Sequence, residues 1–299
     1  MLDLTTIILT YNEEIHIRRC LENVTQFSKK VFVIDSPSTD HTVEICKEFD
    51  IVEVVVHKYP GNQAEQLNWA LDNLDIKTEW ILRLDADEYL SKGLIEEIKE
   101  RTPKLDANVS GVNLQRKHFF MGKLMKFERN AIILRLFRNG KARCENRLMD
   151  EYMFIKDGDV ITYDNLFFDH NLCTLSEYCQ KHINYASREA AMILDEEYKL
   201  SENKSVATAN IGVDGTSIRR SKHYYQNSPL FWRGMAYFIY RYFFTGTFLQ
   251  GRAGFMYCFV QAWWYRNLID GILVEVKRNC GENPDSIKKY LSDKYKIML

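Results

Sequence analysis

The first ninety residues alternate short apolar runs with segments of helical periodicity, and this alternation constrains the fold more than any other feature. The apolar runs are rich in β-branched residues and predict strands, whereas the segments between them space apolar residues three and four positions apart. Such alternation implies a mainly parallel sheet covered by helices on both faces. The predicted strands are Leu4–Leu9, Val31–Ile34, Val52–Val56 and Trp80–Leu84, and the predicted helices are Glu13–Val24, Thr42–Phe49 and Gln63–Leu74.

Polar residues follow three of the predicted strands. These clusters are Thr10–Glu13, Asp35–Asp40 and Asp85–Glu88. The carboxyl ends of parallel strands meet at one edge of a sheet, and ligands of α/β proteins bind beyond that edge. The sequence therefore predicts that the three clusters form one site.

Asp85 and Asp87 are the most informative pair within these clusters. If the strand continues through them, residues two apart share a face and both carboxylates point the same way. Two close negative charges require a positive partner, and Mg²⁺ or Mn²⁺ suits carboxylate oxygens. The alternative is a solvated strand end without a ligand.

Beyond Arg101 the regular alternation fades. Thr174–Glu177 forms a capping-box pattern that predicts the start of a helix extending to about Leu200. The polar residues 201–222 predict a loop or lid. Further strands are predicted at Val109–Leu114, Ile132–Phe137 and Val160–Phe168, with a hairpin signal at Asn139-Gly140.

Residues 229–272 are unusually aromatic and contain interspersed arginines. The longest uncharged run, Ala253–Tyr265, is too short to cross a bilayer as a helix. Aromatic residues with nearby arginines suit helices that lie in the lipid headgroup region. Packing against the rest of the chain or against a second subunit is the alternative. The arginines are Arg233, Arg241, Arg252 and Arg266.

Composition excludes some classes of protein. The formal net charge of −1 argues against a protein that coats nucleic acid, because such binding needs concentrated positive charge. The seven cysteines form no Cys-x-x-Cys pair, which favours reduced thiols in the cytosol over a disulfide framework. The N-terminus lacks the basic and apolar segments of a signal peptide.

Three segments of the N-terminal half match one known family in order and spacing. That half, about residues 4–100, resembles the family 2 glycosyltransferases with the GT-A fold. The matching segments are Ile7–Glu14, an opening strand and turn; Asp35–Asp40, a turn similar to Asp-Asp-Gly-Ser-x-Asp; and Leu84–Tyr89, an Asp-x-Asp region.

The remainder resembles, more loosely, a bacterial subgroup that builds lipopolysaccharide cores and surface polysaccharides. The matching segments are Arg147–Glu151, Phe168–His170 and the aromatic residues around Tyr240–Tyr265. We therefore expect an α/β fold, with a Rossmann-like mixed but mainly parallel sheet in a GT-A domain over residues 1–225. A helical, aromatic-rich region is expected over residues 226–299.

The resemblance implies an inverting, metal-dependent hexosyl transfer from a nucleotide sugar to an acceptor hydroxyl. The expected cofactor is Mn²⁺ or Mg²⁺, bound mainly by Asp87, with Asp85 on the ribose or a metal-bound water and His170 completing the metal shell. UDP is the expected nucleotide and GDP the alternative. Asp35 is expected to contact the base, and the other residues expected to bind the donor are Thr10, Tyr11, Glu13, Gln63, Gln66, Arg219 and Arg220.

One departure from the family concerns the donor phosphates. Many relatives carry a basic residue in the segment that corresponds to Gly61–Leu71, but this segment contains no Lys or Arg. For the general base, Glu151 aligns with the expected carboxylate, and Asp150, which replaces a His of the subgroup, is the second candidate.

Two other functions remain open from the sequence. A catalytically degenerate GT-A domain could serve as a membrane-associated scaffold, and a nucleotidyltransferase would share the nucleotide and metal chemistry but would require a glycine-rich basic first loop. The expected partners are a nucleotide-sugar donor and a glycan or glycolipid acceptor, with no nucleic acid and with a homo-oligomer as an open alternative. The expected location is the cytoplasm, at the inner membrane.

Overall fold

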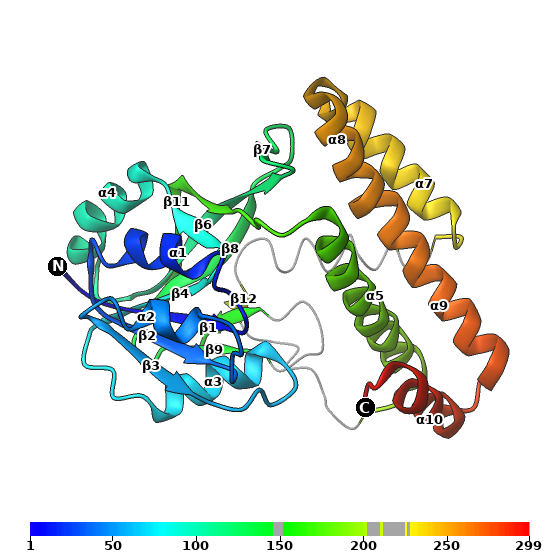
Figure 1. Cartoon of the computed structure of the whole chain (residues 1–299), viewed down its shortest axis with the longest axis horizontal. Helices are drawn as coiled ribbons and strands as arrows, with labels where there is room; N and C mark the ends of the chain where they lie inside the picture. Colours follow the sequence, from blue (N-terminus) through cyan, green and yellow to red (C-terminus); the bar gives the residue numbers. More distant parts are fainter. Residues whose placement is uncertain (146–151, 202–209, 212–224, 226–227, 299) are drawn as a thin grey trace.

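The computed structural model describes residues 1–145, 152–201, 210–211, 225 and 228–298. Figure 1 shows a sheet flanked by helices on one side of the molecule and a group of long helices on the other. The strands are β1 (Leu2–Thr10), β2 (Ser28–Asp35), β3 (Val52–Val56), β4 (Trp80–Asp85), β5 (Glu88–Leu90), β6 (Val109–Phe120), β7 (Lys123–Leu124), β8 (Ala131–Arg138), β9 (Ala142–Cys144), β10 (Met153–Ile155), β11 (Asp159–Asp169) and β12 (Asn210–Ile211).

The main sheet has the order β3-β2-β1-β4-β8-β6-β11-β5, with β7 paired to β6. Strand β1 lies between β2 and β4, and all three are parallel. Strand β8 is antiparallel to both β4 and β6, and β11 is parallel to β6. The strands β1, β2, β4 and β11 therefore end at the same edge, which brings Thr10, Asp35, Asp85 and Asp169 to one side of the sheet.

Both faces of this sheet are buried by apolar side chains. On one face α1 (Ile17–Val24) and α4 (Lys92–Arg101) contribute to the larger core cluster, with Leu21 and Leu94 among its fully buried members. On the other face α3 (Gln63–Asn73) packs Ala64 and Leu67 against the strands. The short helix α2 (Thr42–Cys46) follows β2. The expected mixed, mainly parallel sheet flanked by helices is confirmed.

Two local predictions were wrong. The first helix begins at Ile17 rather than Glu13, since residues 11–16 form turns. The turn at Asn139-Gly140 forms, but β8 and β9 do not pair as a hairpin. Both edges of β8 are already occupied by β4 and β6, so the chain after the turn leaves the sheet and β9 pairs with β10 instead.

The helix α5 (Leu175–Tyr198) joins the two parts of the molecule. It begins with the predicted capping box, in which Thr174 accepts from the backbone N–H of Glu177 and Glu177 accepts from that of Thr174. Its apolar face packs with the C-terminal helices in a separate cluster that includes Leu194, Leu273 and Leu291. The helical part of the fold thus includes α5 in addition to the helices between Trp232 and Tyr295.

The C-terminal helices form a hairpin followed by a short final helix (Figure 1). No helix in the described parts of the chain is both long and apolar enough to cross a membrane. In the described parts of the chain, no two cysteines are joined by a disulfide. The helical elements are α7 (Trp232–Ile239), η2 (Tyr240–Phe244, a π-helix), η3 (Thr247–Gln250, a 3-10 helix), α8 (Gly251–Cys258), η4 (Phe259–Trp264, a π-helix), α9 (Tyr265–Cys280) and α10 (Pro284–Tyr295); η1 (Thr102–Lys104) is a 3-10 turn after α4.

Candidate functional site

Asp35 organises the turn that follows β2. Its carboxylate is almost fully buried and accepts hydrogen bonds from the Thr10 hydroxyl at 3.0 Å and from the Ser38 hydroxyl at 2.6 Å. The Ser38 backbone N–H donates to the second oxygen at 2.9 Å. Thr10 and Asp35 end neighbouring parallel strands, so the predicted convergence of these two residues is confirmed. A carboxylate has room for further donors beyond these three.

The turn after β1 is held by side-chain contacts on both sides. Asn12 adopts a positive φ of 54° and its side-chain oxygen accepts from the Thr39 backbone N–H. The carboxylate of Glu13 contacts Nδ1 of His16, whose Nε2 accepts from the backbone N–H of Leu172 at 2.8 Å. Glu13 therefore fixes the imidazole that ties this turn to the chain after β11. Tyr11 is exposed, with its ring free to stack on a ligand.

Asp85 at the end of β4 is neutralised by two arginines. One carboxylate oxygen accepts from Arg83 at 2.8 Å and the other accepts from Arg135 at 3.1 Å. Partial burial raises the pKa of Asp85, but the charges of Arg83 and Arg135 outweigh it and hold the pKa below its ordinary value. Arg135 also contacts the buried Glu88 at 2.6 Å. Asp85 is thus an ion-paired carboxylate with little negative charge left for a metal.

Asp87 has a different environment two residues later. Strand β4 ends at Asp85, so Asp87 lies in the following turn and strand alternation does not place it. Its carboxylate accepts from the side-chain amide of Asn171 at 3.2 Å and, among the described residues, forms no ion pair. Partial burial and then the charges of Asp169 and Asp85 raise the pKa of Asp87 well above its ordinary value. A cation at this position would relieve that repulsion.

His170 lies directly beside Asp87. Its backbone N–H donates to the Asp87 carbonyl at 3.0 Å, and Arg19 donates to the carbonyls of both residues. The imidazole stacks on Phe119, with the ring centroids 4.2 Å apart. Partial burial and then the nearby charge of Arg19 lower the pKa of His170. The ring is therefore neutral at pH 7, which is the form that binds a metal.

The two glutamines expected to bind the donor differ in their contacts. Gln66 is buried: its side chain contacts Nδ1 and the backbone carbonyl of His57 and the hydroxyl of Ser36. Those contacts occupy both ends of the amide, so Gln66 positions the turn after β2. Gln63 accepts a 3.3 Å hydrogen bond from Arg83, the same arginine that pairs with Asp85.

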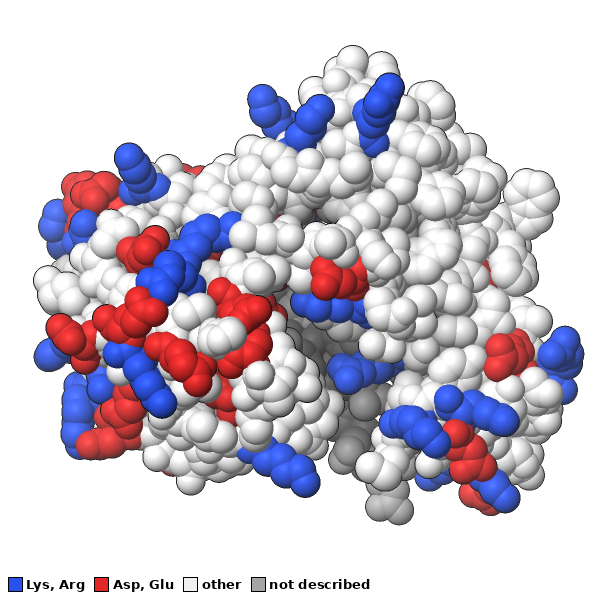
Figure 2. Space-filling model, in the orientation of Figure 1, with Lys and Arg blue, Asp and Glu red and all other residues white. Residues whose placement is uncertain are grey.

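Lys181 on α5 is influenced by the carboxylates of Glu13 and Asp87. Desolvation lowers the pKa of Lys181, but the charges of these two carboxylates outweigh desolvation and raise the pKa above its ordinary value. Figure 2 shows a hollow between the sheet-containing part and the helices, with acidic residues gathered along its sheet side and both basic and acidic residues on its helical side. Lys181 thus adds positive charge near the edge of the sheet.

The residues near Asp87 fit a divalent cation only in part. No group of three His, Cys, Asp or Glu side chains in the described ranges is arranged to hold a metal. Mg²⁺, however, is commonly held by one or two carboxylates together with substrate phosphates. Asp87, with Asp169 and His170 nearby, meets that smaller requirement, and donor phosphates would complete the shell.

Four predicted site residues lie outside the described residues: Asp150, Glu151, Arg219 and Arg220. Sequence reasoning missed Asp169 and three arginines that pair with the carboxylates of the site. Arg83 and Arg135 pair with Asp85, and Arg116 lies 3.8 Å from the carboxylate of Asp169. Arginines within the apolar runs of β4 and β8 were a detectable signal, because a buried charge in a strand must be paired. Asp169 ends β11 next to His170 and was detectable in the same way as Asp85.

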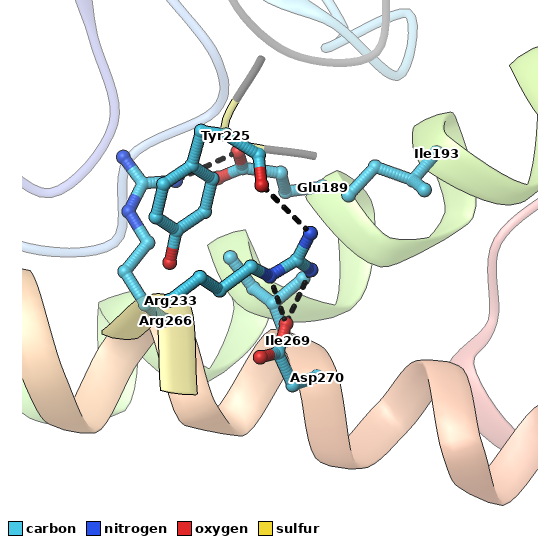
Figure 3. A pocket seen from close by; sticks show the side chains of 7 residues that line it. All are labelled: Glu189, Ile193, Tyr225, Arg233, Arg266, Ile269 and Asp270. Carbon is cyan, nitrogen blue, oxygen red and sulfur yellow. Dashed lines mark hydrogen bonds and ion pairs between the residues drawn. The ribbon is translucent and has the colours of Figure 1, made fainter. Parts of the chain in front are cut away.

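A second polar pocket lies among α5, α7 and α9 and has a structural role. Figure 3 shows Arg233 directed at Asp270, and Tyr225 placed between Arg233 and Arg266. Arg233 Nε donates to Asp270 at 2.9 Å, and Arg266 donates to Glu189 at 3.0 Å. Its charges are paired with one another, so the pocket fastens the helices together.

Comparison with known proteins identifies the family. Residues 5–164 match the profile of glycosyl transferase family 2, which is more than half of the chain, and the chain belongs to that family. The protein is therefore a glycosyltransferase.

The relatives include two proteins described as uncharacterized glycosyltransferases. One, from Rickettsia bellii (strain RML369-C), is 27% identical over 261 residues, or 81% of this chain and 78% of that protein. Another, from Rickettsia typhi, is 34% identical over 99 residues, which span 33% of this chain and only 32% of that protein. The mannosyltransferase PcManGT from Pyrobaculum calidifontis, solved with GDP-Man and Mn²⁺, shows 16% identity over 92% of this chain and 86% of that chain, with a TM-score of 0.48.

Proposed function

We propose that this glycosyltransferase moves a hexose from a nucleotide sugar, with UDP as the expected nucleotide, to an acceptor hydroxyl with inversion at the anomeric carbon. The observation that carries the proposal is the pair of unlike carboxylates at the end of β4. Asp85 is neutralised by Arg83 and Arg135, whereas Asp87 faces Asp169 and has no ion pair among the described residues. Asp87 is thus the carboxylate available to a cation.

Asp87, with His170 beside it, would hold a divalent cation, which would supply stabilisation of the negative charge on the leaving nucleoside diphosphate. The residues of this chain supply the rest of the donor site. Asp35, held by Thr10 and Ser38, faces the base, and Tyr11 offers an exposed ring for stacking. The expected metals are Mn²⁺ and Mg²⁺, with His170 as the additional ligand.

The missing basic residue of the Gly61–Leu71 segment has a candidate replacement in Lys181. Desolvation lowers the pKa of its ammonium, but the charges of Glu13 and Asp87 raise it above its ordinary value, and Lys181 lies on α5, the helix that begins beside the site. Lys181→Gln should weaken donor binding several-fold, while Lys289→Gln on the surface of α10 should leave it unchanged. Equal donor affinity in the two variants would exclude Lys181 as the phosphate contact.

Calorimetric titration of UDP with and without Mn²⁺ tests the donor site directly. We expect binding that requires the metal in the wild type and is lost in Asp87→Asn. Binding of equal strength in the presence of EDTA would contradict the proposal and favour a degenerate domain. A panel of UDP- and GDP-sugars, assayed for hydrolysis, identifies the donor.

The base assignment needs a separate experiment. The resemblance to the bacterial subgroup favours Glu151 over Asp150 as the group that takes the acceptor proton. Glu151→Gln should abolish transfer and leave the donor affinity nearly unchanged. If transfer survives in Glu151→Gln but not in Asp150→Asn, the assignment passes to Asp150.

The proposed pathway role is synthesis of a bacterial cell-surface glycan, such as a lipopolysaccharide core, capsule or O-antigen, on a glycan or glycolipid acceptor. The C-terminal aromatic residues support a peripheral position on the cytoplasmic face of the inner membrane. Several of them, including Trp232, Tyr240 and Phe244, are exposed. Fractionation of cells that produce the full chain tests this location, and recovery in the soluble fraction alone would contradict it.

A further inference from the structure

We infer that one end of the molecule, formed by the β6–β8 connection and the tip of the C-terminal helical hairpin, docks onto an anionic phospholipid bilayer. The inference deepens the peripheral membrane contact proposed above and assigns it to a surface that includes residues of the catalytic half. We call this surface the docking end. Its members are Met121, Lys123, Lys126 and Phe127 of the β6–β8 connection and Phe243, Phe244, Phe248, Leu249 and Arg252 of the helical tip.

The two segments form one surface although they are far apart in sequence. The side chain of Gln250 donates to the Leu124 carbonyl at 2.8 Å and accepts from the Phe127 backbone N–H at 3.4 Å. Beneath them, Phe120 and Met125 share a buried cluster with Ala253 and Tyr257. In Figure 1 the β7 turn and the tip of α8 lie together at the top.

Glu128 ties the same two segments together from inside. It accepts from Arg241 at 2.8 Å and from the Tyr257 hydroxyl at 2.6 Å, and it contacts His118 at 3.1 Å. Glu128 is the acidic residue nearest in sequence to the β7 turn, and these bonds use its charge internally. The exposed Lys123 and Lys126 of the docking end therefore have no exposed acidic residue beside them in the same turn.

Several large apolar side chains on the docking end are highly exposed. Phe244 is 78% exposed, Leu249 is 65% exposed and Met121 is 55% exposed. Phe243 and Phe248 of the same tip lie with their ring centroids 6.4 Å apart, and exposed apolar side chains gathered in this way mark a site of interaction. Aromatic and long aliphatic side chains of this length reach the boundary between headgroups and acyl chains.

The positive charge of the docking end indicates that its partner is negatively charged. Residues 229–269 contain no Asp or Glu, and the exposed Lys123, Lys126 and Arg252 surround the apolar side chains. On the face drawn in Figure 2, Lys and Arg but no Asp or Glu appear over β7 and the tip of α8. Basic residues beside inserted aromatic residues match the negative surface of an anionic bilayer. A second copy of the chain would present the same positive charge and is disfavoured.

Three of the four arginines in the aromatic region do not belong to this surface. Arg233 pairs with Asp270, Arg241 with Glu128 and Arg266 with Glu189. For these three arginines the structure bears out the alternative of packing within the chain. Their roles are internal, and Arg252 is the member left for the bilayer.

Vesicle flotation of the full chain tests the inference. We expect binding to vesicles of phosphatidylcholine with phosphatidylglycerol, weak binding to phosphatidylcholine alone, and loss of binding as salt rises. Phe244→Ser with Leu249→Ser should weaken the binding at least tenfold. Lys123→Gln with Lys126→Gln and Arg252→Gln should weaken it and flatten its salt dependence.

The controls change exposed apolar and basic residues elsewhere on the molecule. Val56→Ser is exposed on β3, and Lys289→Gln with Lys294→Gln lies on α10; these variants should bind as the wild type does. Circular dichroism and calorimetric UDP binding of every variant separate docking from folding and from the donor site. Equal binding of the docking-end variants and the controls would overturn the inference, as would a dimer in light scattering that the Phe244→Ser, Leu249→Ser variant abolishes.

Discussion

The edge of the sheet and the C-terminal helical hairpin both pair charged residues internally, but the charge that stays without an ion pair among the described residues differs in sign. At the edge, Arg83 and Arg135 neutralise Asp85, and the acidic Asp87 remains without an ion pair among the described residues. In the hairpin, internal carboxylates neutralise Arg233 and two further arginines, and the basic Arg252 remains exposed. In each region the candidate for function is the charge left over after internal pairing. A sequence motif shows all the charged residues, but only the structure shows which of them are paired internally and which remain available for a ligand.

The largest expected effect on stability comes from removing an internal ion pair of the helical hairpin. Arg233→Met removes the ion-pair partner of the fully buried Asp270, which keeps, among the described residues, only the hydrogen bond from the Phe231 backbone N–H, and we expect the free energy of unfolding to fall by about 3–5 kcal/mol. Arg252→Met, a change of the same residue type on the surface, should alter it by no more than about 0.5 kcal/mol. Urea denaturation measures both.

A double variant separates the lost ion pair from general disruption. Arg233→Met combined with Asp270→Leu removes both charges and should recover part of the lost stability. If Arg233→Met and Arg252→Met cost the same, the distinction between internal and exposed arginines is wrong.

The next effect tests the edge of the sheet. Asp87→Asn should reduce transfer by about 10²–10³-fold, the usual cost of removing a group that stabilises developing charge. The free energy of unfolding should stay constant or rise, because the neighbouring Asp169 and Asp85 disfavour the charged form of Asp87. The assay is product formation at saturating Mn²⁺, alongside thermal unfolding.

Asp85→Asn is the matched control for that change. It removes ion pairs with Arg83 and Arg135 and should lower the free energy of unfolding by about 1–3 kcal/mol. The two aspartates are therefore expected to differ in the sign of their effect on stability. A similar loss of stability in both variants would show that Asp87 is as well paired as Asp85.

A smaller effect concerns the pH dependence of the contact between the two regions. Burial raises the pKa of Glu128, but the hydrogen bond and charge of His118, with Arg241 and Tyr257, lower it to about 2. A carboxylate with a depressed folded-state pKa stabilises the fold above its unfolded-state pKa, and this stabilisation is lost as the pH falls through the folded-state value. Glu128 should thus contribute about 2–3 kcal/mol at neutral pH, lost between about pH 4.5 and pH 2.

Glu128→Gln should therefore flatten the fall of stability with acid over that range. Urea denaturation at a series of pH values measures it. Glu22→Gln, an exposed carboxylate on α1, is the control and should keep the wild-type slope. An unchanged slope in Glu128→Gln would mean that Glu128 does not hold the helical tip electrostatically.

Much of the fold was predictable because periodicity and capping are local signals. The strand at Val52–Val56 and the capping box at Thr174 are confirmed, since each depends on neighbouring residues alone. The pairing of β9 was not predictable from Asn139-Gly140, because the turn chemistry does not reveal that both edges of β8 are occupied. Register between distant strands is a property of the whole sheet.

The site was predictable in its location and less so in its members. Thr10, Asp35 and Asp85 end parallel strands, and strand order brings them together. Asp87 was chosen on a resemblance, and its distinct environment depends on Asp169 and Asn171, which lie about 80 residues further along the chain. Contacts of that range carry no local signal.

The smallest effect tests whether the two regions are coupled through α5, which begins beside the site and packs against the C-terminal helices. Thr174→Ala removes the cap of α5, and Asn283→Ala removes the cap of α10; each should lower the free energy of unfolding by about 1 kcal/mol. Only Thr174→Ala should also weaken metal-dependent UDP binding, by a few-fold, because Asn171, three residues before that cap, donates to Asp87. Equal UDP affinity in the two variants would show that the sheet edge and the helices act independently, since the loss of stability is matched and only the position of the cap differs.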